Sequence, residues 1–245
     1  MEKQYSEGVL FPEMHIFAHE TKGYRNSVQL QDSSERVFNP MNRFSMDLCQ
    51  HVGFTSMWQM PKVKGVNISA PADIFAFYRL DNKPRPGIWA HCYTNDPRLL
   101  PFIHDPYRMA NRISHYDGVL GLDLSIKPEM PLPIQMAVSF YNKLIMAFWQ
   151  HCGINVVQNV VWGGPSSFDF CFDGYAQHAT VAVNSTGIGR DRRSDYLWHC
   201  GYQAMLERLS PTLIIRYGSK RSGEREDISV YYENDNKKAA RNHGR

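Results

Sequence analysis

Polar side chains interrupt several apolar runs of this sequence, and the most telling of them is a carboxylate. Asp123 lies in Leu-Gly-Leu-Asp-Leu-Ser, with a leucine on each side. Burying a carboxylate costs free energy unless the group has a partner or a use. We therefore predict that Asp123 is a catalytic residue, acting as a general base or binding a hydroxyl group. The other interpretation, that it caps the next segment or pairs with an arginine, stays open.

Further polar, aromatic and glycine residues lie where other apolar runs end. They offer hydroxyl, amide, aromatic and backbone groups to a ligand. The predicted ligand-binding residues are Ser125, Asn159, Trp162, Asn184, Ser185, Gly187 and Tyr217. Ser125 is equally well explained as a turn residue, and no nucleophile elbow surrounds it, so a serine hydrolase is poorly supported. Trp162 could stack on a base or sugar, or simply cover the end of its strand.

The segment Asn184-Ser-Thr-Gly-Ile-Gly189 is predicted to lead from a strand into a helix. In that setting backbone N–H groups and a helix terminus can hold a phosphate or another anion. Arg190, Arg192 and Arg193 add positive charge nearby. The segment lacks both the full dinucleotide-binding fingerprint and the Gly-Lys-Ser/Thr of a nucleotide-hydrolysing loop. It is therefore either an anion site or a plain turn.

Histidines and cysteines give weaker signals. His91 and Asp96 could form an acid–base pair, although a hydrogen-bonded histidine inside the core is the favoured interpretation. His15 and His19 have the spacing of two ligands on one helical face, but no glutamate follows the first of them. The five cysteines contain no Cys-x-x-Cys pair, so we predict reduced, mostly buried thiols and no metal site. The sequence leaves any cofactor unknown.

Strands and helices must position these residues, and the clearest element is a helix at 133–150. Apolar residues recur there at helical spacing. Pro131 and Pro133 stand at its start and Gly153 follows its end, as is typical of helix termini. The apolar, partly β-branched runs at 118–125 and 154–162 flank it, so this part of the chain predicts strand, helix, strand.

The same alternation continues on both sides of this unit. Downstream we predict a strand at 180–186, a helix at 194–209 and a strand at 212–218. Upstream we predict strands at 74–79 and 87–94, then a helical stretch at 96–113 that Pro101 and Pro106 interrupt. Residues 166–174 are either a short capped helix or an alternating strand, and the helix is preferred.

This alternation predicts an α/β fold with a largely parallel sheet of about six strands and βα repeats. The sheet is either an open layer or an incomplete or irregular (βα) barrel, because the chain is too short for the full set of barrel repeats. In such sheets ligands bind beyond the carboxyl ends of the strands. The candidate residues named above lie at those ends.

The 245 residues carry a net charge of +3, which suits one large domain. We predict an N-terminal arm at 1–56, an α/β domain at 57–218 and a basic, flexible C-terminal tail at 219–245. The sequence has neither a signal-peptide pattern nor an apolar run long enough to span a membrane. We therefore expect a cytoplasmic protein without membrane contact.

The stretch 58–218 resembles an uncharacterised domain family of bacteriophages, prophages and other mobile elements of bacteria. The resemblance rests on Asp123-x-Ser125, Trp149-Gln150, Ser167-Phe-Asp-Phe-Cys-Phe-Asp-Gly174 and Val181-Ala-Val183. The third block has an unusual composition, whereas Val-Ala-Val alone would mean little. This chain departs from the family at Tyr175, where members usually have an apolar residue and then proline. The resemblance implies a bacterial host cell and no particular reaction.

Two functions follow from these patterns. The first is a phage or mobile-element protein whose polar pocket binds, or acts on, a phosphate-bearing small molecule or nucleotide. The alternative is a non-catalytic accessory protein that binds a host protein or nucleic acid through its arm and tail. The modest net charge predicts that any contact with nucleic acid is weak and salt-sensitive. Whether the protein is an enzyme stays open, because fold does not imply function.

Overall fold

The computed structural model describes residues 45–79, 87–189 and 191–235. His15, His19 and Arg190, which the sequence analysis named, lie outside the described residues. So do residues 1–44 of the predicted arm and 236–245 of the predicted tail.

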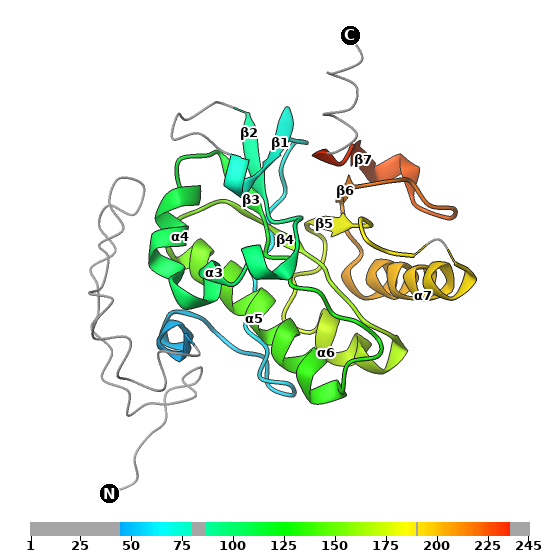
Figure 1. Ribbon diagram of the computed structural model, residues 1–245, viewed down its shortest axis with the longest axis horizontal. Coiled ribbons are helices and arrows are strands. Elements are labelled where there is room, and N and C mark those ends of the chain that lie inside the picture. The colour runs from blue at the N-terminus through cyan, green and yellow to red at the C-terminus, as the bar shows by residue number, and fades with distance from the viewer. Residues whose placement is uncertain (1–44, 80–86, 190, 236–245) are drawn as a thin grey trace, which may run out of the picture.

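Seven strands form one parallel sheet, and each strand pairs with the next one along the chain (Figure 1). The strands are β1 (Asp73–Ala76), β2 (Ile88–His91), β3 (Gly118–Leu120), β4 (Val156–Asn159), β5 (Thr180–Asn184), β6 (Leu213–Tyr217) and β7 (Ser229–Tyr232). The predicted α/β fold with a parallel sheet and βα repeats is confirmed.

The sheet curves into a nearly closed barrel. Of the two predicted alternatives, an open layer and an incomplete or irregular barrel, the structure has the second. Every strand contributes at least one buried side chain to the barrel interior, among them Ile74, Trp89, Leu120, Val157, Ala182, Ile215 and Tyr232. The hydroxyl group of Tyr232 donates a hydrogen bond to the carbonyl of Pro71. This bond links the last strand to the segment that leads into the first.

The seventh strand was not predicted, because it lies in the charged segment that the sequence assigned to a flexible tail. β7 is only four residues long, and it becomes a strand by pairing with β6, with Ile215 opposite Val230 and Tyr217 opposite Tyr232. The division of the chain into arm, domain and tail otherwise stays a prediction.

Helices connect successive strands. The α-helices are α3 (Pro101–His104), α4 (Pro106–Ile113), α5 (Leu132–His151), α6 (Phe168–Phe172) and α7 (Arg192–Leu209). Short 3₁₀ helices are η1 (Met46–His51), η2 (Phe77–Arg79), η3 (Asp96–Arg98), η4 (Pro165–Ser167) and η5 (Glu226–Ile228). Pro101 and Pro106 start α3 and α4, so the predicted helical stretch is divided at both prolines.

Residues 166–172 are helical and a turn follows at 173–174, which confirms the preferred interpretation of this segment. η4 leads directly into α6, and Gly174 follows with a φ of +87°. Ser167 does not cap α6 with its side chain. Its hydroxyl group instead donates to the carbonyl of Gly164 over 2.7 Å and accepts from the N–H of Gly163 over 3.1 Å. The segment after β4 is thereby folded into a tight turn.

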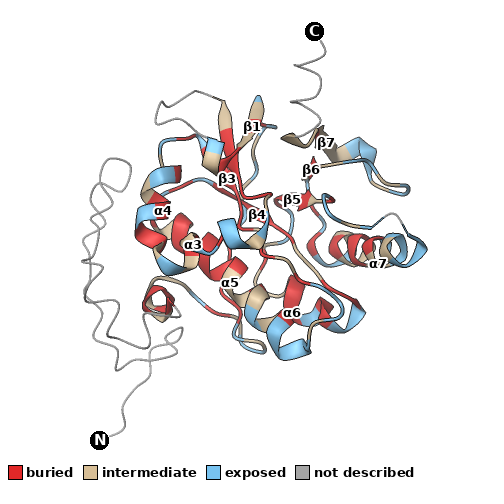
Figure 2. Ribbon diagram, in the orientation of Figure 1, coloured by how far each residue is buried: buried red, intermediate tan, exposed pale blue. Residues whose placement is uncertain are grey.

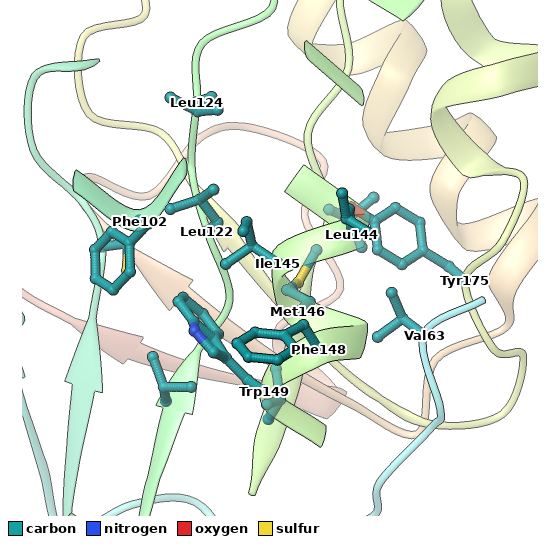
Figure 3. Packing of buried hydrophobic residues seen from close by; sticks show 14 of the residues in the cluster. Val63, Phe102, Leu122, Leu124, Leu144, Ile145, Met146, Phe148, Trp149 and Tyr175 are labelled. Carbon is teal, nitrogen blue, oxygen red and sulfur yellow. The ribbon is translucent and has the colours of Figure 1, made fainter. Parts of the chain in front are cut away.

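The main core lies between the outer face of the sheet and α5. Figure 3 shows Ile145, Phe148 and Trp149 of α5 lying near Leu122 and Phe102. The rings of Trp149 and Phe102 meet edge to face, with centroids 5.1 Å apart. Figure 2 shows β3 and β4 buried along their length, as expected of parallel strands with the barrel interior on one side and helices on the other.

No helix within 45–79, 87–189 or 191–235 combines the length and the apolar character that a membrane span needs.

Candidate functional site

A pocket of about 550 Å³ opens beyond the carboxyl ends of β3, β4 and β5. Its walls are the loop from β3 to α5, residues 160–163 after β4, the loop from β5 to α7 and the first turns of α7. Ligands bind at this edge of the sheet in parallel α/β proteins. Five of the predicted site residues line the pocket: Asp123, Ser125, Trp162, Asn184 and Gly187.

Two amide groups hold the carboxylate of Asp123 at this pocket. Asn159, at the end of β4, donates from Nδ2 to Asp123 Oδ1 over 2.8 Å. Asn184, at the end of β5, donates from Nδ2 to Asp123 Oδ2 over 2.8 Å. Each carboxylate oxygen receives one amide, so the orientation of the group is fixed. The parallel strands thus bring together three predicted residues that lie far apart in the sequence.

Both amides present N–H groups to the carboxylate because their oxygens have other partners. Tyr93 donates from its hydroxyl group to Asn159 Oδ1 over 3.1 Å. The backbone N–H of Thr186 donates to Asn184 Oδ1 over 2.7 Å. These bonds assign which end of each amide is oxygen and which is nitrogen. The site is therefore arranged to hydrogen-bond a carboxylate at position 123.

Burial raises the pKa of Asp123 from 3.8 to about 7. The hydrogen bonds from Asn184 and Asn159 lower this pKa, and the nearby carboxylate of Asp96 raises it. Desolvation outweighs the hydrogen bonds because two neutral donors replace only part of the hydration that the charged form loses. Near neutral pH both protonation states are populated, so Asp123 can accept or donate a proton.

The backbone that carries Asp123 is fixed by Asn142, a buried residue of α5. Asn142 Oδ1 accepts from the N–H of Leu124 over 2.9 Å, and Nδ2 donates to the carbonyl of Leu124 over 3.0 Å. These two bonds replace the backbone hydrogen bonds of a neighbouring strand, because β3 ends at Leu120. The next residue, Ser125, donates from its hydroxyl and its N–H to Asp96 Oδ1 over 3.0 and 3.1 Å.

Trp162 and Trp198 form an aromatic wall of the pocket, with ring centroids 5.1 Å apart. Trp162 also packs against Phe172, at 6.1 Å between centroids. Gly201 of α7 allows this packing, because a Cβ atom there would lie 2.0 Å from Trp162 Nε1. Trp162 thus has a packing role against α7 as well as a place in the pocket wall.

The loop from β5 to α7 lines the pocket through Gly187, whose φ of +84° suits glycine. The N-terminus of α7, however, already holds a carboxylate. Asp191 accepts from the N–H of Ser194 over 3.0 Å and from its hydroxyl over 2.7 Å. The helix end that the sequence suggested for an anion is therefore occupied by its own cap. Of the neighbouring arginines, Arg193 lines the pocket and Arg192 does not.

Ser185 and Tyr217 do not line the pocket. Ser185 is buried, and its hydroxyl donates to the carbonyl of Ser219 over 2.9 Å. Tyr217 packs in the barrel interior against Tyr93, with ring centroids 4.6 Å apart. Ligand binding by these two residues stays a prediction that the geometry does not support.

His91 is buried inside the barrel, and its surroundings favour the core interpretation. Its Nδ1 accepts from the N–H of Tyr93 over 3.1 Å, and its Nε2 lies 3.6 Å from Asp235 Oδ1. The carboxylate beside His91 is therefore Asp235 and not the predicted Asp96, which bonds to Ser125 instead.

Two residues outside the predicted set of catalytic and ligand-binding residues hold this site. Asn142 interrupts an apolar helix face in the same way that Asp123 interrupts an apolar run, so it carried a usable signal. Tyr93 carried a weaker signal: it lies near the end of its predicted strand, as the other candidates do, but a tyrosine on an aromatic strand face also looks like packing. The hydrogen bond from Tyr93 to Asn159 appears only when β2 and β4 are placed on either side of β3.

No group of three or more His, Cys, Asp or Glu side chains among the described residues could hold a metal ion. All five cysteines are free, and four of them are buried, which confirms the prediction for the thiols. Burial raises the pKa of Cys49 and of Cys152 to about 12. These two thiols are therefore poor nucleophiles at neutral pH.

Comparison with known proteins places this chain beside a phage-associated family. A family model described as a domain of unknown function (DUF4417) matches residues 52–235. The Gene 1 protein of Mycobacterium phage L5 is 30% identical over 138 residues, which are 56% of this chain and 60% of that protein. The Gene 1 protein of Mycobacterium phage D29 is 30% identical over 174 residues, which are 68% of this chain and 63% of that protein. The chain thus spans about three fifths of the length of these relatives. No solved structure matches it.

Proposed function

Since this chain belongs to the phage-associated DUF4417 family, whose description gives no activity, we propose a function from the pocket itself. The pocket binds a nucleotide or another small phosphate-bearing molecule. Asp123 hydrogen-bonds that ligand or takes a proton from it.

The observation that carries this proposal is the state of Asp123. Its carboxylate is oriented by the amides of Asn159 and Asn184, and burial raises its pKa to about 7. A raised pKa means that the buried carboxylate lowers the free energy of unfolding at neutral pH. Stabilisation of the fold therefore does not explain why a carboxylate stands at this position. Perturbed pKa values of this kind are typical of functional sites that lie in clefts.

The remaining walls suit a ligand with both polar and apolar parts. Trp162, Trp198 and Leu197 give one side of the pocket an apolar character, and Asp123 and Asn184 give the other side hydrogen-bonding groups. The volume of about 550 Å³ falls within the range of small-molecule sites. A nucleotide offers a planar base to the first side and ribose hydroxyl groups to the second.

Ligand binding is tested directly by isothermal titration and thermal shift with the full chain. The probes are nucleoside monophosphates, the corresponding nucleosides, ribose 5-phosphate and short single-stranded DNA. A bound probe raises the melting temperature by mass action. In Asp123→Ala we expect affinity for the bound probe to fall about tenfold or more, because a hydrogen bond to a charged group is lost.

The control is Asp169→Asn, which changes an exposed carboxylate that pairs with Arg208 on the surface. This variant should bind as the wild type does. Asp123→Asn is less informative, because it would point an amide at the amides of Asn159 and Asn184. If none of the small molecules binds, the pocket proposal fails, and the accessory function through a host protein or nucleic acid becomes the favoured one.

A further inference from the structure

We propose that Arg193 is the residue that selects a phosphorylated ligand, by exchanging its ion pair with Glu129 for the phosphate group. This inference rests on the proposed function of the pocket and names the part of the ligand that each side recognises. Asp123 and Asn184 meet the hydroxyl or base portion, and Arg193 meets the phosphate at the rim.

The ion pair joins two walls of the pocket. Arg193 lies in the first turn of α7, and Glu129 lies in the loop between β3 and α5. Arg193 Nη2 is 3.4 Å from Glu129 Oε1, and both residues line the pocket. The side chains are 73% and 64% exposed, so they stand at the solvent-facing rim while Asp123 lies deeper.

A phosphate at the rim of this pocket would meet cationic side chains. At the N-terminus of α7, Asp191 already occupies the N–H and the hydroxyl group of Ser194. Among the residues that the structure describes, the cationic side chains that line the pocket are those of Lys127 and Arg193. Arg193 is the one placed on α7, next to the loop that contains Gly187.

Exchange of partners is favoured because the two interactions differ in strength. An exposed carboxylate–arginine pair at 3.4 Å is weak and is screened by salt. A phosphate offers more charge and three acceptor oxygens, which match the planar fork of a guanidinium group. In the absence of ligand, Glu129 competes for Arg193, so a neutral ligand gains nothing from this residue.

The test compares each nucleoside with its own 5′-monophosphate in wild type, Arg193→Ala and Glu129→Gln. In wild type the monophosphate should bind at least about tenfold more tightly than the nucleoside, as expected for charge-assisted hydrogen bonds. Arg193→Ala should remove most of this difference, because it weakens binding of the monophosphate far more than binding of the nucleoside. Glu129→Gln should tighten monophosphate binding by about two- to fivefold, because it removes the competing ion pair. The gain is small because an exposed ion pair contributes little free energy.

Arg192→Ala is the matched control, since Arg192 is the exposed neighbour in the same turn of α7 and does not line the pocket. Arg192→Ala should not alter the difference in affinity between the nucleoside and its monophosphate. Equal affinity for the nucleoside and the monophosphate, or an equal loss of both in Arg193→Ala, would overturn the role of Arg193 while the pocket proposal stands. Failure of every nucleoside, every monophosphate and ribose 5-phosphate to bind the wild type would remove the proposed function together with this inference.

Discussion

The hydrogen bonds that Asp123 accepts depend in turn on the hydrogen bonds that its donors accept. Tyr93 fixes the oxygen of the Asn159 amide, so the nitrogen must face Asp123. That donor lowers the pKa of Asp123, although burial still raises it to about 7. Tyr93 is therefore a positioning residue, and its effect should be visible as a shift of this pKa.

In Tyr93→Phe we expect the pKa of Asp123 to rise above its wild-type value, because the Asn159 amide is no longer held as a donor. The folded state binds this proton more tightly than the unfolded chain, whose carboxyl has an ordinary pKa near 3.8. Ionisation therefore lowers the free energy of unfolding as the pH rises from about 4, and this loss is complete only above the folded-state pKa. Urea denaturation at a series of pH values gives the free energy of unfolding of wild type and Tyr93→Phe, each with and without Asp123→Ala. The pH at which the contribution of Asp123 stops changing gives its folded-state pKa.

Tyr175→Phe serves as the control for Tyr93→Phe. The hydroxyl group of Tyr175 donates to the backbone carbonyl of Asn159 over 2.6 Å and does not touch the amide. Its loss should lower the free energy of unfolding by about 1 kcal/mol, with the pKa of Asp123 unchanged. Equal pKa shifts in the two variants would show that Tyr93 does not act by orienting the amide.

At the scale of elements, the sequence located most helices and strands because their apolar residues recur at clear spacings. Its predicted strands at 118–125 and 154–162 extend past β3 and β4, since the apolar run continues after strand pairing ends. In the first case the continuation is the segment that carries Asp123. There the hydrogen bonds of Asn142 replace those of a strand.

The packing of α7 against the pocket gives a prediction at this scale. Gly201→Ala should lower the free energy of unfolding by about 1–3 kcal/mol, because the added Cβ atom meets the indole ring of Trp162. Helix propensity alone predicts a gain of about 1 kcal/mol, so the sign of the change separates the two effects. Urea denaturation measures it. Glu207→Ala, at an exposed position of α7, should change stability by no more than about 0.5 kcal/mol.

For the whole molecule, the last described segment contributes to the core as well as to the sheet. Arg216 of β6 and Glu224 are both buried, with Nη2 and Oε1 2.6 Å apart. Arg216 also donates to the carbonyl of Val183 over 2.8 Å. The segment between β6 and β7 therefore supplies the countercharge for a buried guanidinium group, and removal of residues 219–245 would take away β7 and this countercharge together.

Glu224→Ala should lower the free energy of unfolding by about 3–5 kcal/mol, because it leaves the buried charge of Arg216 uncompensated. Chemical denaturation measures the loss. Glu226→Ala is the matched control, since Glu226 forms an exposed pair with Lys220 and should cost about 1 kcal/mol or less. The double variant Arg216→Met with Glu224→Leu should regain much of the lost stability. Equal effects of the two single variants would contradict a role for the buried pair.

The sequence by itself determined the alternation of strands and helices, the parallel sheet and the importance of Asp123 as a polar residue in an apolar run. These features depend on local spacing, which the chain displays directly. It also singled out Asn159 and Asn184, because each ends a strand.

Only the tertiary structure decided which of these residues meet. The strand order sets Tyr93, which follows β2, against Asn159 of β4, and the curvature of the sheet places Tyr217 inside the barrel and outside the pocket. The tertiary structure also shows that β7 pairs with β6, and that Asp191 caps the N-terminus of α7. Each of these contacts joins groups whose pairing depends on strand register and helix placement. A linear sequence does not display those distances, so they had to come from the fold.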